Sequence, residues 1–347
     1  MAEDQSIELP QVEGRPLVTF ALFAYNQEKY IREAVEGAFA QTYDPLEIIL
    51  SDDCSTDRTF EIMEEMALAY KGPHKILIRK SPVNRGLGLH ILDVSELMNG
   101  HYVIVAGGDD ISLPHRTIAL IKTMHKERRK LAASNYNRMS EFGKIEEYNI
   151  TNCYESNYLW KIIDSNANYF VLGCTAAYEK YFFVSALKSA KNTIEKGYLF
   201  NEDDLFSAFA VATNEKPAEY ASSALVNYRA GTTSLSSQTQ ASKTLEDEER
   251  KIQTERFRSQ TRLALLEAVI EMACNYPFLN KKLNKEKIFK DLHLSEMEIY
   301  SSEPSITKRL YSLSRIKSIV DLKIWIVRVL GTKFHARLRW HLKKPTT

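Results

Sequence analysis

Apolar and polar residues alternate along the first third of the chain, with a spacing that differs between short and longer segments. Four short segments are rich in apolar residues and bounded by polar ones: 17–24, 46–50, 75–79 and 101–106. Such apolar runs are typical of parallel strands covered on both faces. Three longer segments between them carry apolar residues at helical spacing: 30–39, 60–67 and 87–98. Strands alternating with helices of this length predict right-handed βαβ crossovers and a mainly parallel sheet.

The pattern is harder to interpret after this region. It predicts a helix over 115–129 and a strand over 131–136, whereas the Asn- and Tyr-rich segment 140–230 gives no clear succession of elements. A loop rich in Ser, Thr and Gln follows, and long helical patterns then continue to residue 347. We therefore expect an extended or disordered N-terminus, an α/β domain and a helical C-terminal region, with the bounds 1–14, 15–240 and 241–347.

Polar side chains are concentrated where the predicted strands end. The three clusters are Tyr25-Asn26, Ser51-Asp52-Asp53 and Gly107-Gly108-Asp109-Asp110. Ligands of open α/β sheets bind outside the carboxyl ends of the strands. The topology therefore predicts that residues far apart in the sequence meet at one edge of the sheet and form a ligand site there.

Asp109 and Asp110 are the most informative pair in the chain. Two adjacent carboxylates at the end of a buried strand repel each other and need a positively charged partner. A divalent cation that also binds phosphate oxygens would supply it, and Gly107 and Gly108 would let backbone and ligand approach closely. The alternative, an acidic turn at a helix entry, explains one aspartate more readily than two. The segment therefore predicts a metal-assisted nucleoside-diphosphate site.

Asp53 and Tyr25 are the candidates for contacts with the nucleoside. A carboxylate at Asp53 can accept a hydrogen bond from a nucleobase ring N–H, although aspartates also close turns. Tyr25 suits a nucleobase or ribose contact, although an aromatic residue there could also belong to the core. Asp57 is at least as well explained as the N-cap of the following helix as by a ligand contact.

The acidic segment Glu202-Asp203-Asp204 precedes a helical stripe, where acids in the first turn would complement the helix dipole. The segment could instead supply the carboxylate base that deprotonates an acceptor hydroxyl during sugar transfer with inversion. Arg229 is unremarkable in isolation, but beside a diphosphate its guanidinium would match phosphate geometry. Asn84-Arg85-Gly86 resembles a short glycine-rich loop without a Walker lysine–serine pair or a GxGxxG pattern.

Composition narrows the functional classes. Of the 347 residues, 44% are hydrophobic and 26% are charged, which fits a soluble globular protein, and a net charge of +1 argues against a nucleic-acid partner. The four cysteines show neither zinc spacing nor a disulfide framework, which predicts reduced thiols and a cytoplasmic location. Neither a signal-peptide core nor an apolar run of membrane-spanning length is visible in the sequence.

Residues 305–347 carry eleven Lys or Arg and a single acid, Asp321, interleaved with apolar residues and tryptophans. A basic amphipathic helix of this kind can lie on an anionic membrane surface, which would make the protein peripheral on the inner face of the membrane. Alternatively, the helix packs on its own domain and presents a solvated basic face. The sequence leaves both interpretations open.

Taken in order, these segments resemble glycosyltransferase family 2, the inverting nucleotide-sugar transferases of the GT-A fold. The resemblance covers roughly residues 15 to 240 and rests on seven segments: Phe23-Ala24-Tyr25-Asn26, Gln41-Thr42-Tyr43, 47–57, Asn84-Arg85-Gly86, Gly107-Gly108-Asp109-Asp110, Glu202-Asp203 and Tyr228-Arg229. Three positions depart from the family pattern. Cys54 replaces a glycine after the aspartate pair, Gly108 replaces a third acid, and Leu89-His90 stand where a basic residue is frequent. These departures affect donor identity more than the fold.

The resemblance implies an α/β, Rossmann-like GT-A catalytic domain over 15–240, with a mixed, mainly parallel sheet flanked by helices. It implies nucleotide binding at these residues: Phe23 (through its main chain), Tyr25, Asp53, Asn84, Asp109 and Arg229. Asp110, with Asp109, would hold Mn²⁺ or Mg²⁺. Asp203 matches the general base, with Glu202 and Asp204 as less favoured alternatives, and Gly173-Cys174-Thr175 aligns with a loop beside the donor phosphates and the acceptor.

By the same resemblance, the donor would be a UDP- or dTDP-sugar and the acceptor a glycan or a lipid-linked saccharide, as in bacterial-type surface polysaccharide assembly. One alternative is a sugar-phosphate nucleotidylyltransferase, whose Gly- and Arg-rich loop after the first strand is not matched by Ala24-Tyr25-Asn26-Gln27. The other alternative is a catalytically silent, nucleotide-binding scaffold associated with a membrane.

Overall fold

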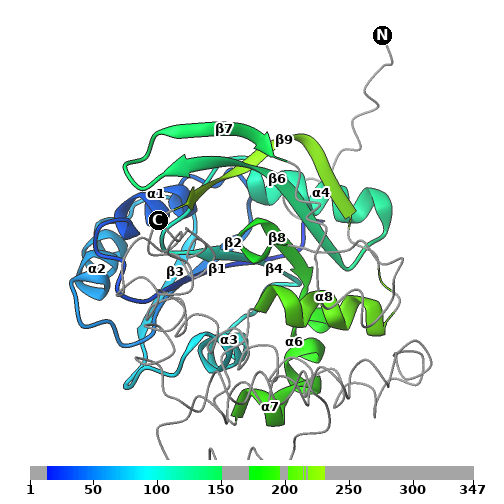
Figure 1. Ribbon diagram of the computed structural model, residues 1–347, viewed down its shortest axis with the longest axis horizontal. Coiled ribbons are helices and arrows are strands. Elements are labelled where there is room, and N and C mark those ends of the chain that lie inside the picture. The colour runs from blue at the N-terminus through cyan, green and yellow to red at the C-terminus, as the bar shows by residue number, and fades with distance from the viewer. Residues whose placement is uncertain (1–13, 151–171, 196–201, 214, 216–217, 231–347) are drawn as a thin grey trace, which may run out of the picture.

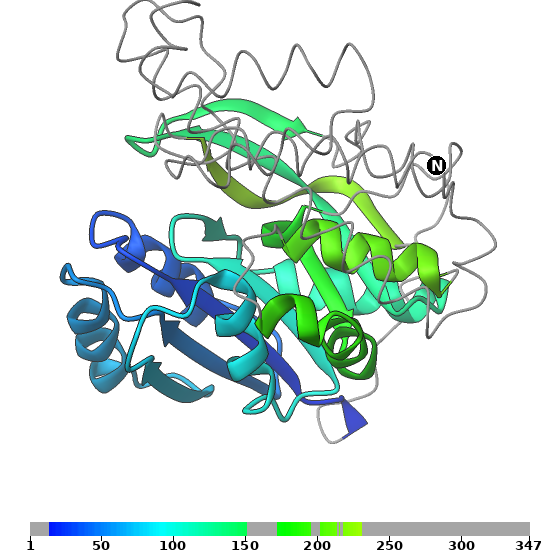
Figure 2. The same ribbon diagram turned by 60° about the horizontal axis from the view of Figure 1, so that its bottom comes forward.

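The computed structural model describes residues 14–150, 172–195, 202–213, 215 and 218–230, which form one sheet with helices on both faces (Figures 1 and 2). The predicted N-terminal segment, except Gly14, and the predicted helical region 241–347 lie outside the described residues. In the described part of the chain, no helix combines the length and the apolar character needed to cross a bilayer.

The first half of the domain alternates strands and helices as the sequence predicts. Its strands are β1 (Val18–Ala24), β2 (Leu46–Asp52), β3 (Lys75–Lys80) and β4 (Tyr102–Gly107). Its helices are α1 (Ile31–Phe39), α2 (Thr59–Ala69), α3 (Leu87–Ser95) and α4 (Arg116–Glu127). Each element lies where the hydrophobic pattern predicts it, and only the ends are shifted by a few residues.

The second half contains β6 (Leu131–Ser140), which the pattern predicts over 131–136, together with elements that the pattern leaves unresolved. Its other strands are β5 (Ile111–Ser112), β7 (Ile145–Ile150), β8 (Ala176–Glu179) and β9 (Ala218–Ala230). A 3₁₀ turn, η2 (Gly173–Thr175), directly precedes β8. The helices are α6 (Lys180–Ser189), α7 (Lys191–Glu195) and α8 (Glu202–Ala212).

The strands form one sheet in the order β3-β2-β1-β4-β8-β6-β9-β5, with β7 paired to β6. β1 lies between β2 and β4 and is parallel to both, so the carboxyl ends of these three strands are neighbours. β8 is antiparallel to β4, whereas β6 and β9 are parallel to each other. The predicted mixed, mainly parallel α/β fold is therefore confirmed, and its all-parallel part brings together the strand ends that carry the polar clusters.

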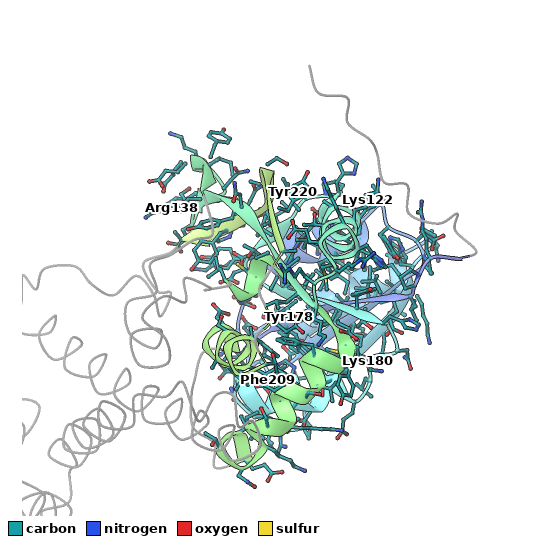
Figure 3. All side chains as sticks on the ribbon, turned by 90° about the vertical axis from the view of Figure 1, so that its right-hand side faces the viewer. Lys122, Arg138, Tyr178, Lys180, Phe209 and Tyr220 are labelled. Atoms are coloured by element: carbon teal, nitrogen blue, oxygen red, sulfur yellow. The ribbon has the colours of Figure 1, made fainter. Side chains whose placement is uncertain are left out.

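Alternate residues of β1 face two hydrophobic layers. Phe20 and Leu22 pack with α1, α2 and α4 on one side of the sheet, and Ala21 and Phe23 pack with α3, α6 and α8 on the other (Figure 1). In the second layer, the ring centroids of Tyr178 and Phe206 are 4.6 Å apart. Figure 3 shows Tyr178 inside this packing, whereas exposed side chains such as Lys122 and Arg138 project from the rim.

Candidate active site

The loop between β4 and β5 carries Asp109 and Asp110, and Gly107 gives both carboxylates a common open side. A Cβ atom added at Gly107 would lie 2.9 Å from Asp109 Oδ1 and 3.6 Å from Asp110 Oδ2. Both carboxylates therefore border the space that a side chain at residue 107 would fill. Glycine at this position leaves that space to a ligand, in agreement with the close approach that the sequence predicts.

Gly108 faces protein atoms rather than the space at Gly107. A Cβ atom there would collide with Gln27 Oε1 and lie 3.0 Å from the Cβ atom of Ala24. The Gly108 N–H donates to Phe23 O at 2.9 Å, and the Asp53 N–H donates to the next carbonyl, Ala24 O, also at 2.9 Å. Two successive carbonyls at the end of β1 thus fix the acidic loop on one side and the end of β2 on the other.

Asp110 is 6% exposed, and burial raises its pKa to about 8, with repulsion from Asp109 adding to the shift. Three groups act in the opposite direction. The Arg229 N–H donates to Asp110 Oδ1 at 2.8 Å, the Cys174 thiol donates to the same carboxylate, and the Arg116 guanidinium attracts it. Burial also raises the pKa of Asp109. Raised pKa values on adjacent acids mark a site whose negative charge the protein compensates only in part.

This acidic pair fits a divalent cation that is also bound by a diphosphate. Mg²⁺ and similar hard cations commonly use one or two carboxylates, and take their other ligands from substrate phosphates and water. Among the described residues, no group of three or more His, Cys, Asp or Glu side chains could hold a metal ion by itself. Asp109 and Asp110 would therefore hold a cation only together with the oxygens of a bound ligand.

Cys174 lies in η2, between the acidic loop and α8. Burial raises the pKa of its thiol well above the ordinary value, and the negative charges of Asp110 and Asp203 add to the shift. Because both carboxylates act on one thiol, Asp203 in the first turn of α8 lies near the acidic loop. On either side of Cys174, Gly173 and Thr175 are buried. The predicted base and the predicted metal-binding acid thus both lie within electrostatic reach of Cys174.

Asp52 and Asp57 close turns beside the end of β2. Asp52 Oδ2 accepts the Ser55 N–H at 2.8 Å, and Asp52 Oδ1 accepts the Ser55 hydroxyl. Asp57 Oδ1 accepts the N–H and the hydroxyl of Thr59 at 3.0 and 2.6 Å, at the start of α2. Burial acts to raise the pKa of Asp57, but these hydrogen bonds outweigh it and lower the pKa. Both aspartates are thus engaged in local structure, as the turn interpretation predicts. The N-cap position of α2 is Arg58, so Asp57 lies one residue before the N-cap, although its carboxylate accepts the first N–H of the helix.

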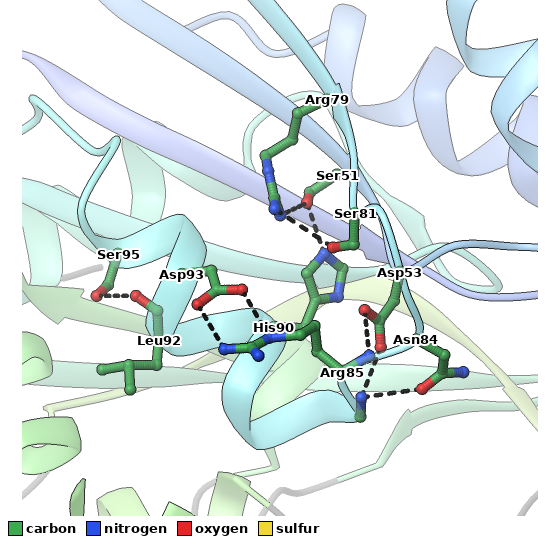
Figure 4. A network of polar contacts seen from close by, with 11 residues as sticks. Ser51, Asp53, Arg79, Ser81, Asn84, Arg85, His90, Leu92, Asp93 and Ser95 are labelled. Carbon is green, nitrogen blue, oxygen red and sulfur yellow. Dashed lines mark hydrogen bonds and ion pairs between the residues drawn. The ribbon is translucent and has the colours of Figure 1, made fainter. Parts of the chain in front are cut away.

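Asp53 is buried, and its carboxylate binds the loop that precedes α3. Its Oδ1 accepts the Arg85 N–H at 2.9 Å and its Oδ2 accepts the Gly86 N–H at 2.8 Å (Figure 4). Asn84 Oδ1 also accepts the Gly86 N–H, at 3.0 Å. Asp53 therefore orders the Asn84-Arg85-Gly86 segment, a role that the sequence does not reveal. The predicted nucleobase contacts of Asp53 and Asn84 stay predictions.

A buried histidine lies beside this loop and is absent from the sequence-based candidates. The ring of His90 packs edge-on against Phe23 at 5.2 Å between centroids, and His90 Nε2 lies 2.6 Å from Ser51 Oγ. Arg79 donates to the same Ser51 hydroxyl at 2.8 Å (Figure 4). Burial lowers the pKa of His90 to about 4, so the imidazole is neutral at physiological pH. The rings of His90 and Phe23 therefore form an uncharged surface near Asp53.

Tyr25 is 45% exposed directly after β1, where the sequence predicts a nucleoside contact. Its neighbour Asn26 adopts a left-handed conformation with φ 52°. The Asn26 N–H donates to Ser55 Oγ at 2.8 Å, and Asn26 Oδ1 accepts the Thr56 N–H at 2.9 Å. These bonds fasten the end of β1 to the turn after β2, and the Tyr25 ring stays open to solvent at the edge that carries Asp53.

Arg229 lies in β9, and its guanidinium is engaged within the protein. Its Nε donates to Asp109 O at 2.9 Å, its Nη1 donates to Glu141 O at 2.9 Å, and its Nη2 pairs with Glu33 at 2.5 Å. The guanidinium also lies 4.7 Å from the centroid of the Tyr30 ring. In this arrangement Arg229 supports the acidic loop. The predicted clamp on a phosphate would require the guanidinium to leave these partners.

Two supporting residues beside the acidic loop are not found by sequence reasoning. The Gln27 amide hydrogen-bonds the Asp109 carboxylate. Arg116 is fully buried and interacts electrostatically with Asp110. Arg116 does leave a signal in the sequence, because it shares one face of α4 with the apolar residues Leu120 and Met124. Glu202 and Asp204 lie in the first turn of α8, but their side chains fall outside the described part.

Residues 19–189 match the family model of Glycosyl transferase family 2. These residues belong to that family, which confirms the resemblance that the motifs indicate. The match begins inside β1 and ends at the end of α6, so it includes Asp53, the acidic loop and Cys174. Asp203 and Arg229 lie beyond it.

Curated relatives match shorter segments. An uncharacterized protein of Mycobacterium tuberculosis is 41% identical over 88 residues, which is 25% of this chain and 25% of that protein. An uncharacterized glycosyltransferase of Haemophilus influenzae is 32% identical over 126 residues, 36% of this chain and 38% of that protein. Chondroitin synthase of Escherichia coli is 34% identical over 110 residues, 32% of this chain and 16% of that protein. The matches therefore span well under half the length of each relative.

Solved structures show a more distant likeness over most of the chain. TarS 1-349 of S. aureus, solved in complex with UDP-GlcNAc, has a TM-score of 0.47 at 15% identity, with 90% of both chains covered. The mannosyltransferase PcManGT of Pyrobaculum calidifontis, solved in complex with GDP-Man and Mn²⁺, has a TM-score of 0.46 at 13% identity. That comparison covers 95% of this chain and 88% of the other. Likenesses of this size say nothing about the donor of this chain.

Proposed function

We propose that this chain moves a sugar from a nucleoside-diphosphate sugar to an acceptor hydroxyl, with inversion at the anomeric carbon. The observation that carries the proposal is the acidic Asp109-Asp110 pair that faces the space at Gly107, with Asp110 buried and with Asp203 of α8 within electrostatic reach of the neighbouring Cys174 side chain. In an inverting transfer, one group assists the departing diphosphate while a base acts on the acceptor from the opposite face of the sugar. Two acids from separate elements near one point support such a division of roles.

Asp203 is the proposed general base. It is partly buried in the first turn of α8. Its carboxylate would take the proton of the acceptor hydroxyl while that oxygen attacks the anomeric carbon, and the bond from this carbon to the diphosphate oxygen breaks. Loss of a positioned base typically lowers the rate by about 10²- to 10⁴-fold. Glu202 and Asp204 are the alternatives in the same turn, and single amide variants distinguish the three.

Asp109 and Asp110 are the proposed ligands of Mn²⁺ or Mg²⁺. When bound, the cation neutralises negative charge that develops on the departing nucleoside diphosphate. The raised pKa values of both aspartates support this role, because a cation favours the ionised carboxylates that the free protein disfavours. Gly173, Cys174 and Thr175 would border the donor phosphates and the acceptor.

Asp53 and Tyr25 are the proposed contacts of the nucleoside. Each Asp53 oxygen accepts one main-chain N–H. An ionised carboxylate oxygen has a further lone pair, so Asp53 can still accept a ring N–H from a base. We therefore propose a uracil or thymine donor, UDP- or dTDP-linked, with the exposed ring of Tyr25 against the base or the ribose.

The proposed acceptor is a glycan or a lipid-linked saccharide at the inner face of a membrane, in surface polysaccharide assembly. Support comes from the basic, Trp-containing segment 305–347. We expect the full chain to sediment with vesicles that contain anionic lipid, and a truncation after residue 304 to stay in solution. Neutral vesicles serve as the control. Equal sedimentation of the two proteins would contradict the membrane proposal alone.

The catalytic proposal is tested by separating nucleotide binding from turnover. Binding is measured as the thermal shift of the full chain with nucleoside diphosphates and their sugars, in Mn²⁺ and in chelator. Turnover is measured as release of the nucleoside diphosphate. Asp203→Asn should lose turnover and keep binding, whereas Asp110→Ala should lose the metal-dependent part of binding. Glu127→Gln, at the exposed far end of α4, is the control and should behave as the unmodified chain.

Each variant tests the role proposed for one aspartate. Intact turnover in purified Asp203→Asn would refute the base, and intact metal-dependent binding in Asp110→Ala would refute the metal ligand. Nucleotide binding without sugar transfer or sugar release under all conditions would favour the silent scaffold instead.

A further inference from the structure

Arg116 is the first residue of α4 and the largest side chain that is entirely buried in the described part of the chain. Its Nε has no hydrogen-bond partner, and no described carboxylate lies within 4.0 Å of its nitrogens. Burying a cation without a direct ion pair costs several kcal/mol in proteins. Such an arrangement persists where nearby negative charge or a structural requirement offsets that cost.

Two hydrogen bonds of the guanidinium reach the two ends of the acidic loop. Arg116 Nη2 donates to Val105 O at 2.7 Å, near the end of β4. Arg116 Nη1 donates to Ser112 Oγ at 2.8 Å, in β5. The segment between these contacts, residues 106–111, contains both Asp109 and Asp110. One rigid, planar group therefore fixes how far apart the ends of the loop lie.

A third hydrogen bond joins this loop to the segment with Cys174. Arg116 Nη2 also donates to Ala176 O at 3.2 Å, directly after η2. The thiol of Cys174 donates to the Asp110 carboxylate, and both groups interact electrostatically with Arg116. The guanidinium therefore holds three chain segments whose side chains meet at Asp110.

The guanidinium of Arg116 also lies 5.9 Å from the centroid of the Phe20 ring, and Asp110 is the carboxylate that acts on its charge. The hydrogen-bond acceptors of Arg116 are neutral oxygens, and its electrostatic interactions are with the side chains of Cys174, Asp110 and Tyr178. The other nearby guanidinium, that of Arg229, is paired with Glu33. Arg116 is thus a buried positive charge on the protein side of the loop, while Gly107 leaves the ligand side open.

We propose that Arg116 is a positioning residue, which fixes the acidic loop and the Cys174 segment in the arrangement that receives a cation-bound diphosphate. This inference rests on the proposed function. Arg116 itself touches neither donor nor acceptor. Groups that hold metal ligands in place typically change metal affinity by about 10- to 100-fold when they are removed.

The test compares variants that separate charge from geometry. Arg116→Lys keeps the charge but cannot span three acceptors, and Arg116→Met removes both. Ser112→Ala removes one end of the bridge and leaves the guanidinium in place. Thr117→Val is the matched control, because Thr117 is also fully buried in α4 but bonds Gln41 at 2.7 Å instead of the acidic loop.

Isothermal titration with UDP, in Mn²⁺ and in chelator, gives the readout, and the thermal midpoint of each variant is recorded beside it. We expect Arg116→Lys and Arg116→Met each to weaken Mn²⁺-dependent affinity by about tenfold or more, with Ser112→Ala changing it less in the same direction. Affinity in chelator should change little. Thr117→Val should lower the midpoint while leaving both affinities unchanged, which separates positioning from general destabilisation.

Wild-type affinity in Arg116→Lys, or tighter Mn²⁺-dependent binding in Arg116→Met, would overturn the inference, since charge alone would then explain Arg116. Should the Arg116 variants fail to fold, wild-type Mn²⁺-dependent affinity in Ser112→Ala would overturn it. A wild-type chain that binds no nucleoside diphosphate in Mn²⁺ would instead refute the proposed function.

Discussion

Asp110→Asn should stabilise the chain when metal and nucleotide are absent, although it removes a proposed metal ligand. Asp110 is buried beside Asp109, and burial followed by this repulsion raises its pKa to about 8. Asparagine has nearly the same shape and keeps an Oδ1 that can accept the Arg229 N–H. The substitution therefore removes an unfavourable charge and retains the hydrogen bond from the Arg229 N–H.

The sign and size of the effect follow from the pKa of Asp110 in the folded chain. Because it lies above the ordinary value of 3.8, the ionised form opposes folding, and stability falls as the pH rises from about 4 to about 8. At 1.36 kcal/mol for each pKa unit, the full shift corresponds to roughly 5 kcal/mol at pH 8 and to almost nothing at pH 4. At roughly 2 °C for each kcal/mol, the thermal midpoint of Asp110→Asn should rise by up to about 10 °C.

The assay is thermal unfolding of purified wild type and variant in chelator, at pH 5 and at pH 8. Asp57→Asn is the control with the opposite sign, because hydrogen bonds from Thr59 outweigh burial and hold the pKa of Asp57 below its ordinary value. This variant should therefore be less stable than wild type. In Mn²⁺ and UDP the order should change, since the ligands would stabilise wild type but not Asp110→Asn.

The reasoning fails if Asp110→Asn is no more stable than wild type at pH 8 while Asp57→Asn is destabilised. It also fails if the gain at pH 5 equals the gain at pH 8, because a pH-independent effect would come from packing and not from a buried charge.

Three further substitutions test separate parts of the structure. Glu47→Ala should lower the free energy of unfolding by about 3 to 5 kcal/mol in urea denaturation, because buried Glu47 accepts hydrogen bonds from Thr19 and Asn99, each at 2.6 Å. Burial acts to raise the pKa of Glu47, but these bonds outweigh it and lower the pKa, so the contribution should be full above about pH 4.5 and disappear in acid. Gly100→Ala should abolish soluble expression or lower the thermal midpoint by several degrees, since the added Cβ would collide with the main-chain nitrogen of Thr19. Asp53→Asn should speed amide exchange at residues 85 and 86 and weaken UDP binding by about tenfold, because one carboxylate acceptor becomes a donor facing a main-chain N–H.

The sequence predicts the first half of the fold well for a specific physical reason. Strands such as β1 are buried on both faces and are parallel to their neighbours, so they read as apolar runs between amphipathic helices. The second half lacks this signal. β8 has only 4 residues, and β9 pairs with β6 across a long stretch of chain, with shifts in register. Pairing at such sequence separation leaves no local pattern to detect.

The sequence predicts those site residues whose positions follow from the strand order. It does not predict those whose roles depend on particular hydrogen-bond or ion-pair partners. Asp53 follows β2 and Asp110 follows β4, the two strands that flank β1 in parallel, so the strand order alone brings them to one edge. The sequence does not reveal that Asp53 binds residues 85 and 86, or that Arg229 pairs with Glu33. Sequence reasoning does not single out Arg116, because an arginine at the start of a helix normally lies in solvent. Its place on an apolar helical face is the feature that could have revealed it.

The last two carbonyls of β1 set the spacing between the two parts of the site that would bind the proposed donor. Ala24 O holds the residue that would read the base, and Phe23 O holds the loop that would carry the charge of the diphosphate. The distance between the base-binding residue and the acidic loop is thus set by the main chain of β1 and does not depend on the side chains of Phe23 or Ala24. Exchanging the chemistry at residue 53 could then alter which base is accepted while leaving the distance to the scissile bond unchanged.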